Sequence, residues 1–188
     1  LNPTDHYQMT GPADFATMAA TEVNGHRALT MDVPAGAMPF VASRIGQPRA
    51  IGSEGAGEVV AAGENARHLL GKRVTVNAGG MYAQYRLVNL SSCLELPAGV
   101  TAAQGAAAFV NPLTVLGFIE TARSEGHSAI VHAAAASNLG QMLVKACRAD
   151  GIALVNIVRS QAQVDLLKGL GATYVLDSTS PSFMADLV

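Results

Sequence analysis

The chain has 188 residues, of which 49% are hydrophobic and 14% are charged, which excludes a disordered or fibrous protein. Its net charge of −2 gives no basis for binding nucleic acid or an acidic membrane surface. Two cysteines are too few for a disulfide framework or a four-thiolate zinc site, and no stretch has the roughly 18 apolar residues of a membrane helix. A cytoplasmic location is therefore expected.

The first half of the chain, residues 1–100, is rich in glycine, proline and short apolar runs. Residues 12–50 show little periodicity and are predicted to be an inserted loop, with one short helix at residues 14–21. Short strands separated by glycines favour a small antiparallel barrel or sandwich. These strands are predicted at residues 57–63, 72–76, 81–88 and 94–96.

The second half, residues 101–188, alternates between helical and strand patterns. The apolar run at residues 129–133 suits a strand buried on both faces. The pattern is βαβαβ, one mononucleotide-binding half of a doubly wound parallel sheet, so the fold class is α/β. The strands are predicted at residues 129–133, 152–158 and 174–176, and the helices at 101–108, 112–123, 139–150, 161–170 and from 182 onward.

The turn after the first of these strands is a candidate dinucleotide site. Such a turn needs small residues so that backbone N–H groups and a helix N-terminus can approach the pyrophosphate. Only Gly140 keeps a glycine of the usual G-x-G-x-x-G pattern, and Ala136, Ser137, Asn138 and Leu139 precede it. The alternative is a packed turn that binds nothing.

The end of the second strand favours NADPH over NADH. Arg159 lies 19 positions after Gly140, where an NAD site usually has Asp or Glu to bind the ribose hydroxyls. Arg159 and the following Ser160 instead offer a cation and a hydroxyl, which suit the 2′-phosphate of NADPH. The alternative is a solvated arginine at a strand end.

Five segments together resemble the medium-chain dehydrogenase/reductase superfamily, and its zinc-free quinone reductase and enoyl-thioester reductase branches in particular. They are N-P-T-D-H-Y at residues 2–7, G-S-E-G-A-G-E-V at 52–59, V-N-P-L-T at 110–114, the turn at 132–140 and N-I-V-R at 156–159. The resemblance implies a GroES-like antiparallel β-barrel domain followed by the first half of a Rossmann NADPH-binding domain. Members are usually much longer, so we expect residues 1–188 to be part of a longer protein, inactive when expressed alone and a homodimer at full length.

The resemblance also assigns roles to single residues. Tyr7 matches the active-site tyrosine of quinone reductases, and Asn111 and Thr114 match residues that face the nicotinamide. The alternatives are a packing tyrosine and residues that cap a helix near Pro112. The proton-donating tyrosine of enoyl reductases lies a few residues after Tyr7, where this chain has no tyrosine, which disfavours enoyl-thioester reduction.

No metal is expected. The positions that bind catalytic zinc in the alcohol dehydrogenases of the superfamily correspond to Asn2, Ser53 and Val110, none of which is a good zinc ligand. The hypothesis is therefore an NADPH-dependent, zinc-independent reductase that transfers hydride to a small electron-poor acceptor, a quinone or a conjugated alkene. Two alternatives stay open: a non-catalytic nucleotide-binding or structural protein, and a zinc alcohol dehydrogenase.

Overall fold

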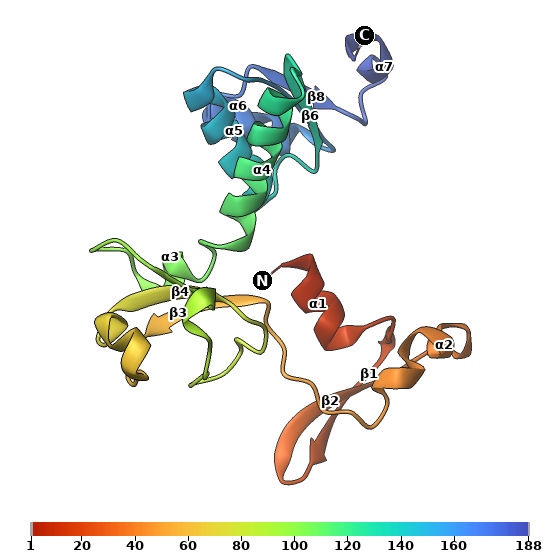
Figure 1. Cartoon of the computed structure of the whole chain (residues 1–188). Coiled ribbons are helices and arrows are strands. Elements are labelled where there is room, and N and C mark those ends of the chain that lie inside the picture. Colours follow the sequence, from red (N-terminus) through yellow and green to blue (C-terminus); the bar gives the residue numbers. More distant parts are fainter. Residues whose placement is uncertain (1, 188) are drawn as a thin grey trace. The chain divides into compact units, whose positions relative to one another are not determined.

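The computed structural model describes residues 2–187. The chain forms two compact units, Leu1–Ala106 and Ala107–Val188, which are described separately (Figure 1). No helix among residues 2–187 has both the length and the apolar character needed to cross a membrane.

The first unit opens with the helix α1, Pro3–Thr10. Proline suits the first position of a helix because the N–H it lacks would have no intrahelical partner there. The Asp5 carboxylate accepts a hydrogen bond of 2.9 Å from the backbone N–H of Asn2, which closes the N-terminal turn. Gly11 ends the helix at φ 55°, with its N–H bonded to the carbonyl of Tyr7.

A β-hairpin, not a loop with a short helix, follows α1. Strand β1, Asp14–Val23, pairs antiparallel with β2, His26–Asp32. The two residues between the strands, Asn24 and Gly25, have φ 52° and 79°, as a type I′ turn requires. The expectation of a helix at 14–21 was wrong, because Asn-Gly between two strand-forming runs is a strong hairpin signal.

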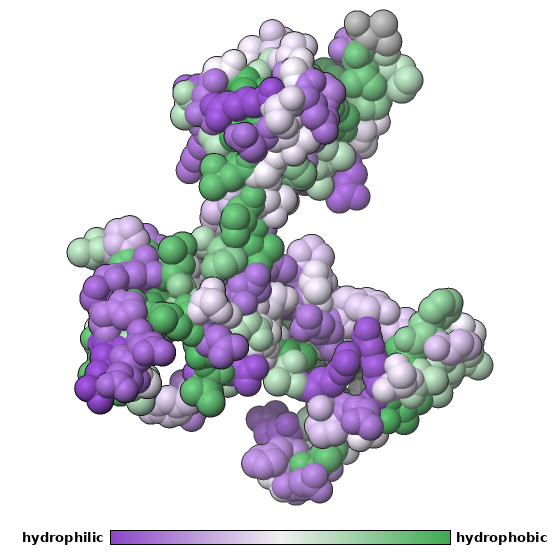
Figure 2. Space-filling view, viewed as in Figure 1, coloured by the Kyte–Doolittle hydropathy of each residue, from purple (hydrophilic) through white to green (hydrophobic). Residues whose placement is uncertain are grey.

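The segment after the hairpin contains three short helical turns: η1, Ala35–Ala37, α2, Met38–Val41, and η2, Ala42–Arg44. Val41 is buried, whereas the Phe40 side chain is 75% exposed. Figure 2 shows this exposed apolar surface over α2. Residues 12–50 are therefore largely regular structure.

The first unit also contains a three-stranded antiparallel sheet, in the order β3-β4-β5. Val74 and Val76 of β4 pack with Leu69 in a small core. Strand β3, predicted at residues 57–63, begins three residues earlier than expected and ends at Glu58. The closed barrel stays a prediction. The strands are β3, Glu54–Glu58, β4, Arg73–Asn77, and β5, Cys93–Glu95, with the turns η3, Glu64–Leu69, and η4, Leu90–Ser92, before β4 and β5.

The strand predicted at residues 81–88 is not formed. Gly79 and Gly80 turn the chain at φ 68° and 64°, and the next residues follow the glycine-rich segment before β3. The N–H groups of Met81 and Tyr82 donate to the carbonyls of Gly52 and Ile51, at 3.1 and 3.0 Å. A Cβ on Gly52 would lie 2.4 Å from the Tyr82 ring, so only glycine fits there.

The first unit ends with the short helix α3, Ala102–Gly105. Thr101 caps it, because its side chain accepts a hydrogen bond from the backbone N–H of Gln104, whose side chain accepts from the N–H of Thr101. The helix predicted at 101–108 is therefore present but shorter.

The second unit has the predicted βαβαβ order, and its three strands are parallel in the order β6-β7-β8. The helix α4 precedes the first strand, and α5 and α6 connect the strands. The elements are α4, Val110–Ser124, β6, Ala129–Ala133, α5, Asn138–Asp150, β7, Ala153–Val158, α6, Gln161–Gly169, β8, Tyr174–Asp177, and α7, Phe183–Asp186.

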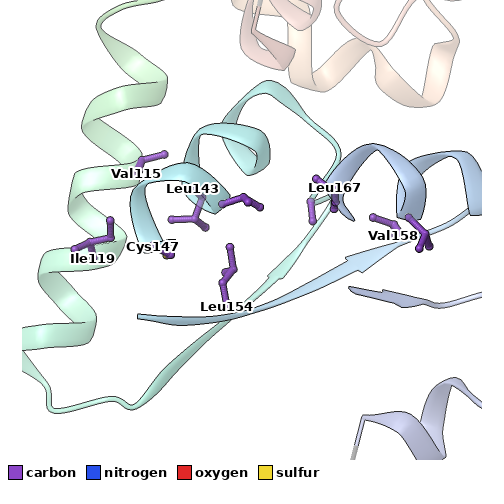
Figure 3. Close-up of a cluster of buried hydrophobic side chains, with 10 residues drawn as sticks. Val115, Ile119, Leu143, Cys147, Leu154, Val158 and Leu167 are labelled. Atoms are coloured by element: carbon purple, nitrogen blue, oxygen red, sulfur yellow. The ribbon is translucent and has the colours of Figure 1, made fainter. Parts of the chain in front are cut away.

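The core of this unit lies between the helices and one face of the sheet (Figure 3). Leu143 and Cys147 of α5 pack with Val115 and Ile119 of α4, and Leu154 of β7 points into the same cluster. The amphipathic stripe of α5 supplies these contacts, and the left-handed Gly151 at φ 68° ends that helix.

Strand β6 is not buried on both faces in the described part of the chain. Its residues alternate between partly buried and exposed, and the side chain of Val131 is 61% exposed. The helices α4, α5 and α6 all contribute to one cluster, so only one face of the strand is covered by it.

Candidate active site

A buried carboxylate joins two of the sequence motifs in the first unit. The Asp5 side chain is 2% exposed, and its Oδ1 accepts hydrogen bonds from the N–H and the hydroxyl of Ser53, both at 2.7 Å. The neighbouring Asn2 side chain donates to Oε1 of Glu54 at 2.9 Å. These contacts fix α1 against the start of β3.

Hydrogen bonding controls the ionisation of this carboxylate. Burial alone would raise the pKa of Asp5, but hydrogen bonds from Asn2 and Ser53 together lower it below its ordinary value. The Tyr82 hydroxyl lies 3.4 Å from Oδ2 of Asp5. Burial, and then the negative charge of Asp5, raise the pKa of Tyr82. Asp5 is therefore a charged structural group at neutral pH.

Tyr7, the predicted hydrogen-bond donor, lies two residues after Asp5 on the exposed side of α1. Its side chain is 46% exposed, and the guanidinium carbon of Arg44 lies 5.7 Å from its ring centroid. A cation at this distance is attracted by the face of the ring. The ring is therefore available to a ligand and has a positive charge beside it.

Tyr7 lines an open cavity of about 940 Å³ within the first unit. Two arginines, Arg44 and Arg49, belong to its wall, and no carboxylate does. Sequence reasoning missed both arginines, because they fall in the segment predicted as a loop; the only signal was two cations in an otherwise uncharged stretch, residues 33–51. The remaining lining residues are Thr4, Gln8, Met9, Thr10, Gly11, Pro12, Val33, Val41, Ile45, Gln47, Ala50, Ile51, Gly79 and Gly80.

Two of the positions that correspond to zinc ligands have other contacts. Asn2 donates to Glu54, and the Ser53 hydroxyl donates to Asp5. Val110, the third position, is the first residue of α4 in the second unit. Among residues 2–187 no group of three or more His, Cys, Asp or Glu side chains is arranged to hold a metal ion.

The second unit contains the predicted nucleotide turn, between β6 and α5. Ala134 takes the left-handed conformation at φ 55°, where glycine is more usual. Ser137 caps α5 by accepting a hydrogen bond of 3.2 Å from the N–H of Gly140. A Cβ on Gly140 would lie 2.1 Å from the carbonyl oxygen of Ala135, so this glycine allows the helix to approach the turn.

The other predicted turn residues have distinct surroundings. Leu139 packs against the core, and the carbonyl of Ala136 accepts a hydrogen bond of 2.9 Å from the side chain of Gln141. Asn138 is exposed in the first turn of α5. The first N–H groups of a helix have no intrahelical partner, so this end of α5 can bind an anion.

Arg159 and Ser160 directly follow β7, at the same carboxyl edge of the sheet as the turn. The turn and β7 are linked by a hydrogen bond of 3.3 Å from the N–H of Ala135 to the carbonyl of Ile157. The Arg159 side chain is exposed and forms no ion pair within the described residues, while its backbone N–H donates to Oε1 of Gln163 at 2.9 Å. An exposed cation without an ion pair in the described residues thus follows β7 at the edge of the sheet where α5 begins.

Asn111 and Thr114 both belong to α4, in its first turns. Neither caps the helix, because the residue before its start is Phe109. The Thr114 hydroxyl donates to the carbonyl of Val110 at 2.8 Å, a bond within the helix. Asn111 is partly buried. Their predicted role at the nicotinamide stays a prediction.

His132 and Asn156 are cross-strand neighbours on the covered face of the sheet. Nε2 of His132 and Oδ1 of Asn156 are buried and have no hydrogen-bond partner among residues 2–187. The Phe118 ring lies 6.1 Å from the imidazole, centroid to centroid. Burial lowers the pKa of His132, so its neutral form is favoured.

Comparisons with known proteins agree with this architecture. The chain is 32% identical over 136 residues to a quinone oxidoreductase of Pseudomonas aeruginosa, a match that covers 70% of this chain and 42% of that protein. It is 26% identical over 137 residues to the human mitochondrial enoyl-[acyl-carrier-protein] reductase, covering 69% of this chain and 37% of that protein. The chain therefore spans less than half the length of these relatives.

A solved structure is similar over more of the chain. A Mesorhizobium loti protein assigned as an NADPH:quinone reductase superposes with a TM-score of 0.67 and 27% identity, covering 95% of this chain and 61% of that one. No family model matches the chain.

Proposed function

We propose that this chain acts in hydride transfer from NADPH to an electron-poor acceptor, because it belongs to the medium-chain dehydrogenase/reductase superfamily, in the zinc-free, quinone oxidoreductase-like branch. NADPH, when bound, supplies the hydride. The protein binds and orients the two reactants and stabilises the charge that develops on the acceptor.

The residues of the nucleotide turn fit a dinucleotide. With Gly140 close to Ala135 and its N–H bonded to the Ser137 cap, the backbone N–H groups of Asn138 and Leu139 are the ones that can bind a pyrophosphate. Arg159 would pair with the 2′-phosphate, and Ser160 can add a hydroxyl. The free guanidinium of Arg159 at the end of β7 is the single observation that carries the choice of NADPH.

An acceptor without a metal beside it must itself be electron-poor. A quinone, or an alkene conjugated to a carbonyl group, meets this condition, because the carbonyl oxygen takes the negative charge as hydride arrives. We assign Tyr7 as the residue that donates a hydrogen bond to that oxygen, since its ring lies in the cavity wall and Arg44 beside it favours negative charge.

Two measurements test the proposal. NADPH binding is followed with the product of the complete gene by the change in nicotinamide fluorescence. Reduction of 9,10-phenanthrenequinone is followed at the absorbance of NADPH, with the product of the complete gene. We expect the substitution Tyr7→Phe to lower turnover roughly 100-fold, the scale for loss of one donor to a developing oxyanion. The matched control is Tyr85→Phe, because Tyr85 is 79% exposed and outside the cavity wall.

Each outcome has a distinct meaning. Binding of NADPH without reduction of any quinone would leave a nucleotide-binding protein and refute the catalytic part. Equal turnover by the Tyr7→Phe and Tyr85→Phe variants would remove the role of Tyr7. Absence of NADPH binding would refute the proposal as a whole.

A further inference from the structure

The cavity beside Tyr7 has a pronounced imbalance of charge. Its wall contains the guanidinium groups of Arg44 and Arg49 but no carboxylate. Neither arginine forms an ion pair within residues 2–187. Asp5 forms no ion pair with either arginine within these residues, and its two oxygens accept hydrogen bonds from Asn2 and Ser53.

The two arginines keep hydrogen-bonding capacity for a ligand. Arg44 ends the turn η2 and is partly buried, with its guanidinium carbon 5.7 Å from the Tyr7 ring centroid. A contact with the face of the ring leaves the in-plane N–H donors of the guanidinium free. Arg49 follows Pro48 and is exposed at the cavity wall. A concave wall with a single sign of charge concentrates ions of the opposite sign.

The rest of the wall is mixed, with polar side chains at Thr4, Gln8, Thr10 and Gln47 and apolar side chains between them. Of the apolar residues, Met9 is at the end of α1 and Pro12 follows that helix, while Val41, Ile45 and Ile51 come from the segment between the hairpin and β3. The cavity thus offers an apolar surface, a tyrosine hydroxyl and two cations to one ligand. Ligand sites of this kind bind an apolar body and orient it with a few polar groups.

We propose that this cavity selects an acceptor that carries an anionic group, a carboxylate or a phosphate, and that Arg44 and Arg49 bind this group. The apolar side chains of the wall then hold the flat electron-poor part of the acceptor beside Tyr7. This inference rests on the proposed reduction of an electron-poor acceptor and names the class of substrate for it. Both arginines come from residues 12–50, so the specificity lies in a segment that none of the five sequence motifs covers.

The test measures ligand binding to the 188-residue chain without NADPH. Anthraquinone-2-carboxylate and the neutral 2-(hydroxymethyl)anthraquinone are titrated by calorimetry. We expect the carboxylate to bind roughly tenfold more tightly than the neutral probe, as a charge-assisted hydrogen bond would provide. Raising the salt concentration from about 50 mM to about 300 mM should weaken the binding of the carboxylate probe alone, because salt screens exposed charges.

Substitutions locate the effect. The double substitution Arg44→Gln with Arg49→Gln should abolish the preference for the anionic probe, whereas Arg27→Gln should keep it. Arg27 is exposed on β2 outside the cavity wall, and its substitution removes one positive charge, as each of the two cavity substitutions does. If circular dichroism shows that the double variant is unfolded, Arg49→Gln alone gives the test, because its exposed side chain has no hydrogen bond within the described residues. That variant should lose part of the preference.

Competition with inorganic phosphate and with acetate separates the two anion classes, and displacement by either supports an anion site. Equal affinity of the wild-type chain for both probes, or an unchanged preference in the arginine variants, would overturn the proposal. If neutral quinones are reduced and the two probes bind equally, the anion site is refuted and the proposed reductase activity is supported. If the carboxylate probe is preferred but no quinone is reduced, the anion site is supported and the proposed reductase activity is refuted.

Discussion

Replacement of Arg159 by alanine should weaken NADPH binding and leave NADH binding nearly unchanged. The side chain is exposed and has no ion pair in the described part of the chain, so its removal breaks no contact of the fold. The backbone N–H keeps its hydrogen bond to Gln163. The loss should therefore be in binding and not in folding.

The magnitude follows from the exposure of Arg159. A hydrogen bond to a charged group contributes about 1.5–3 kcal/mol, and solvent screening favours the lower end. About 1.5 kcal/mol corresponds to roughly a tenfold change in Kd. The ratio of the two affinities, Kd for NADH over Kd for NADPH, should fall by the same factor.

Fluorescence titration of both nucleotides measures this ratio in the wild-type chain and in the Arg159→Ala variant. Lys168→Ala is the matched control, because Lys168 is an exposed cation in the last turn of α6 and its loss changes the net charge equally. Equal losses of NADPH and NADH affinity in the Arg159 variant would refute the assignment. So would an equal loss of NADPH affinity in the Lys168 variant.

Four further outcomes are expected. The substitution Gly140→Ala should destabilise the chain and reduce NADPH binding, because the new Cβ would collide with the backbone of Ala135. The control Gly169→Ala should do neither, because its Cβ meets no atom within 4 Å. Chemical unfolding of the two variants compares their stabilities. Ala134→Gly should stabilise the chain by up to about 1 kcal/mol by relieving a left-handed alanine, and an unchanged unfolding midpoint would contradict this. The Asp5 carboxylate, with its pKa below the ordinary 3.8, should contribute stability at neutral pH that is lost as pH falls through its folded value, and Asp5→Asn should flatten that part of the profile. His132 has a pKa below 6.5, so the unfolded chain takes up the proton first, and stability should decrease as pH falls from 6.5 toward the folded pKa; His132→Phe should remove this slope.

The second unit could be predicted from the sequence because its signals are local. The strand expected at residues 129–133 is β6, Ala129–Ala133, and the helix that follows it ends at Gly151 as expected. The exposed face of β6 could not be predicted, since a run of apolar residues does not say which elements will cover it. The helices α4, α5 and α6 contribute to one core cluster, and Val131 lies outside it.

The first unit was harder to predict because its pairing is nonlocal. Residues 81–88 alternate as a strand does, but the chain turns at Gly79 and Gly80 and bonds to Gly52 instead of extending along a neighbour. The hairpin at residues 14–32 was missed for a different reason. Its Asn24-Gly25 sequence is a hairpin-turn signal, but the scattered alanine and threonine residues around it gave no clear strand pattern.

In the candidate site, the residue that belongs to a sequence motif could be predicted, whereas its neighbours in the cavity could not. The sequence pointed to Tyr7 through a motif, and the structure explains the motif: Asp5 accepts hydrogen bonds from Ser53, which ties α1 to the start of β3. The neighbours of Tyr7 in the cavity could not be found in this way, because Arg44 and Arg49 belong to a segment without periodicity or motif.

Substitutions in the motifs and substitutions in the cavity wall should affect different properties of the protein. The motif residues form the hydrogen bonds that hold the first unit together, whereas most side chains of residues 33–51 are exposed and face either solvent or the cavity. Substitutions of exposed residues usually alter stability by less than about 0.5 kcal/mol, while loss of a buried charge network costs several times more. Changes at Arg44 or Arg49 are thus expected to alter which ligand binds before they alter folding. Changes at Asp5 or Ser53 are expected to do the reverse, so thermal unfolding and probe affinity should respond to the two pairs in opposite order.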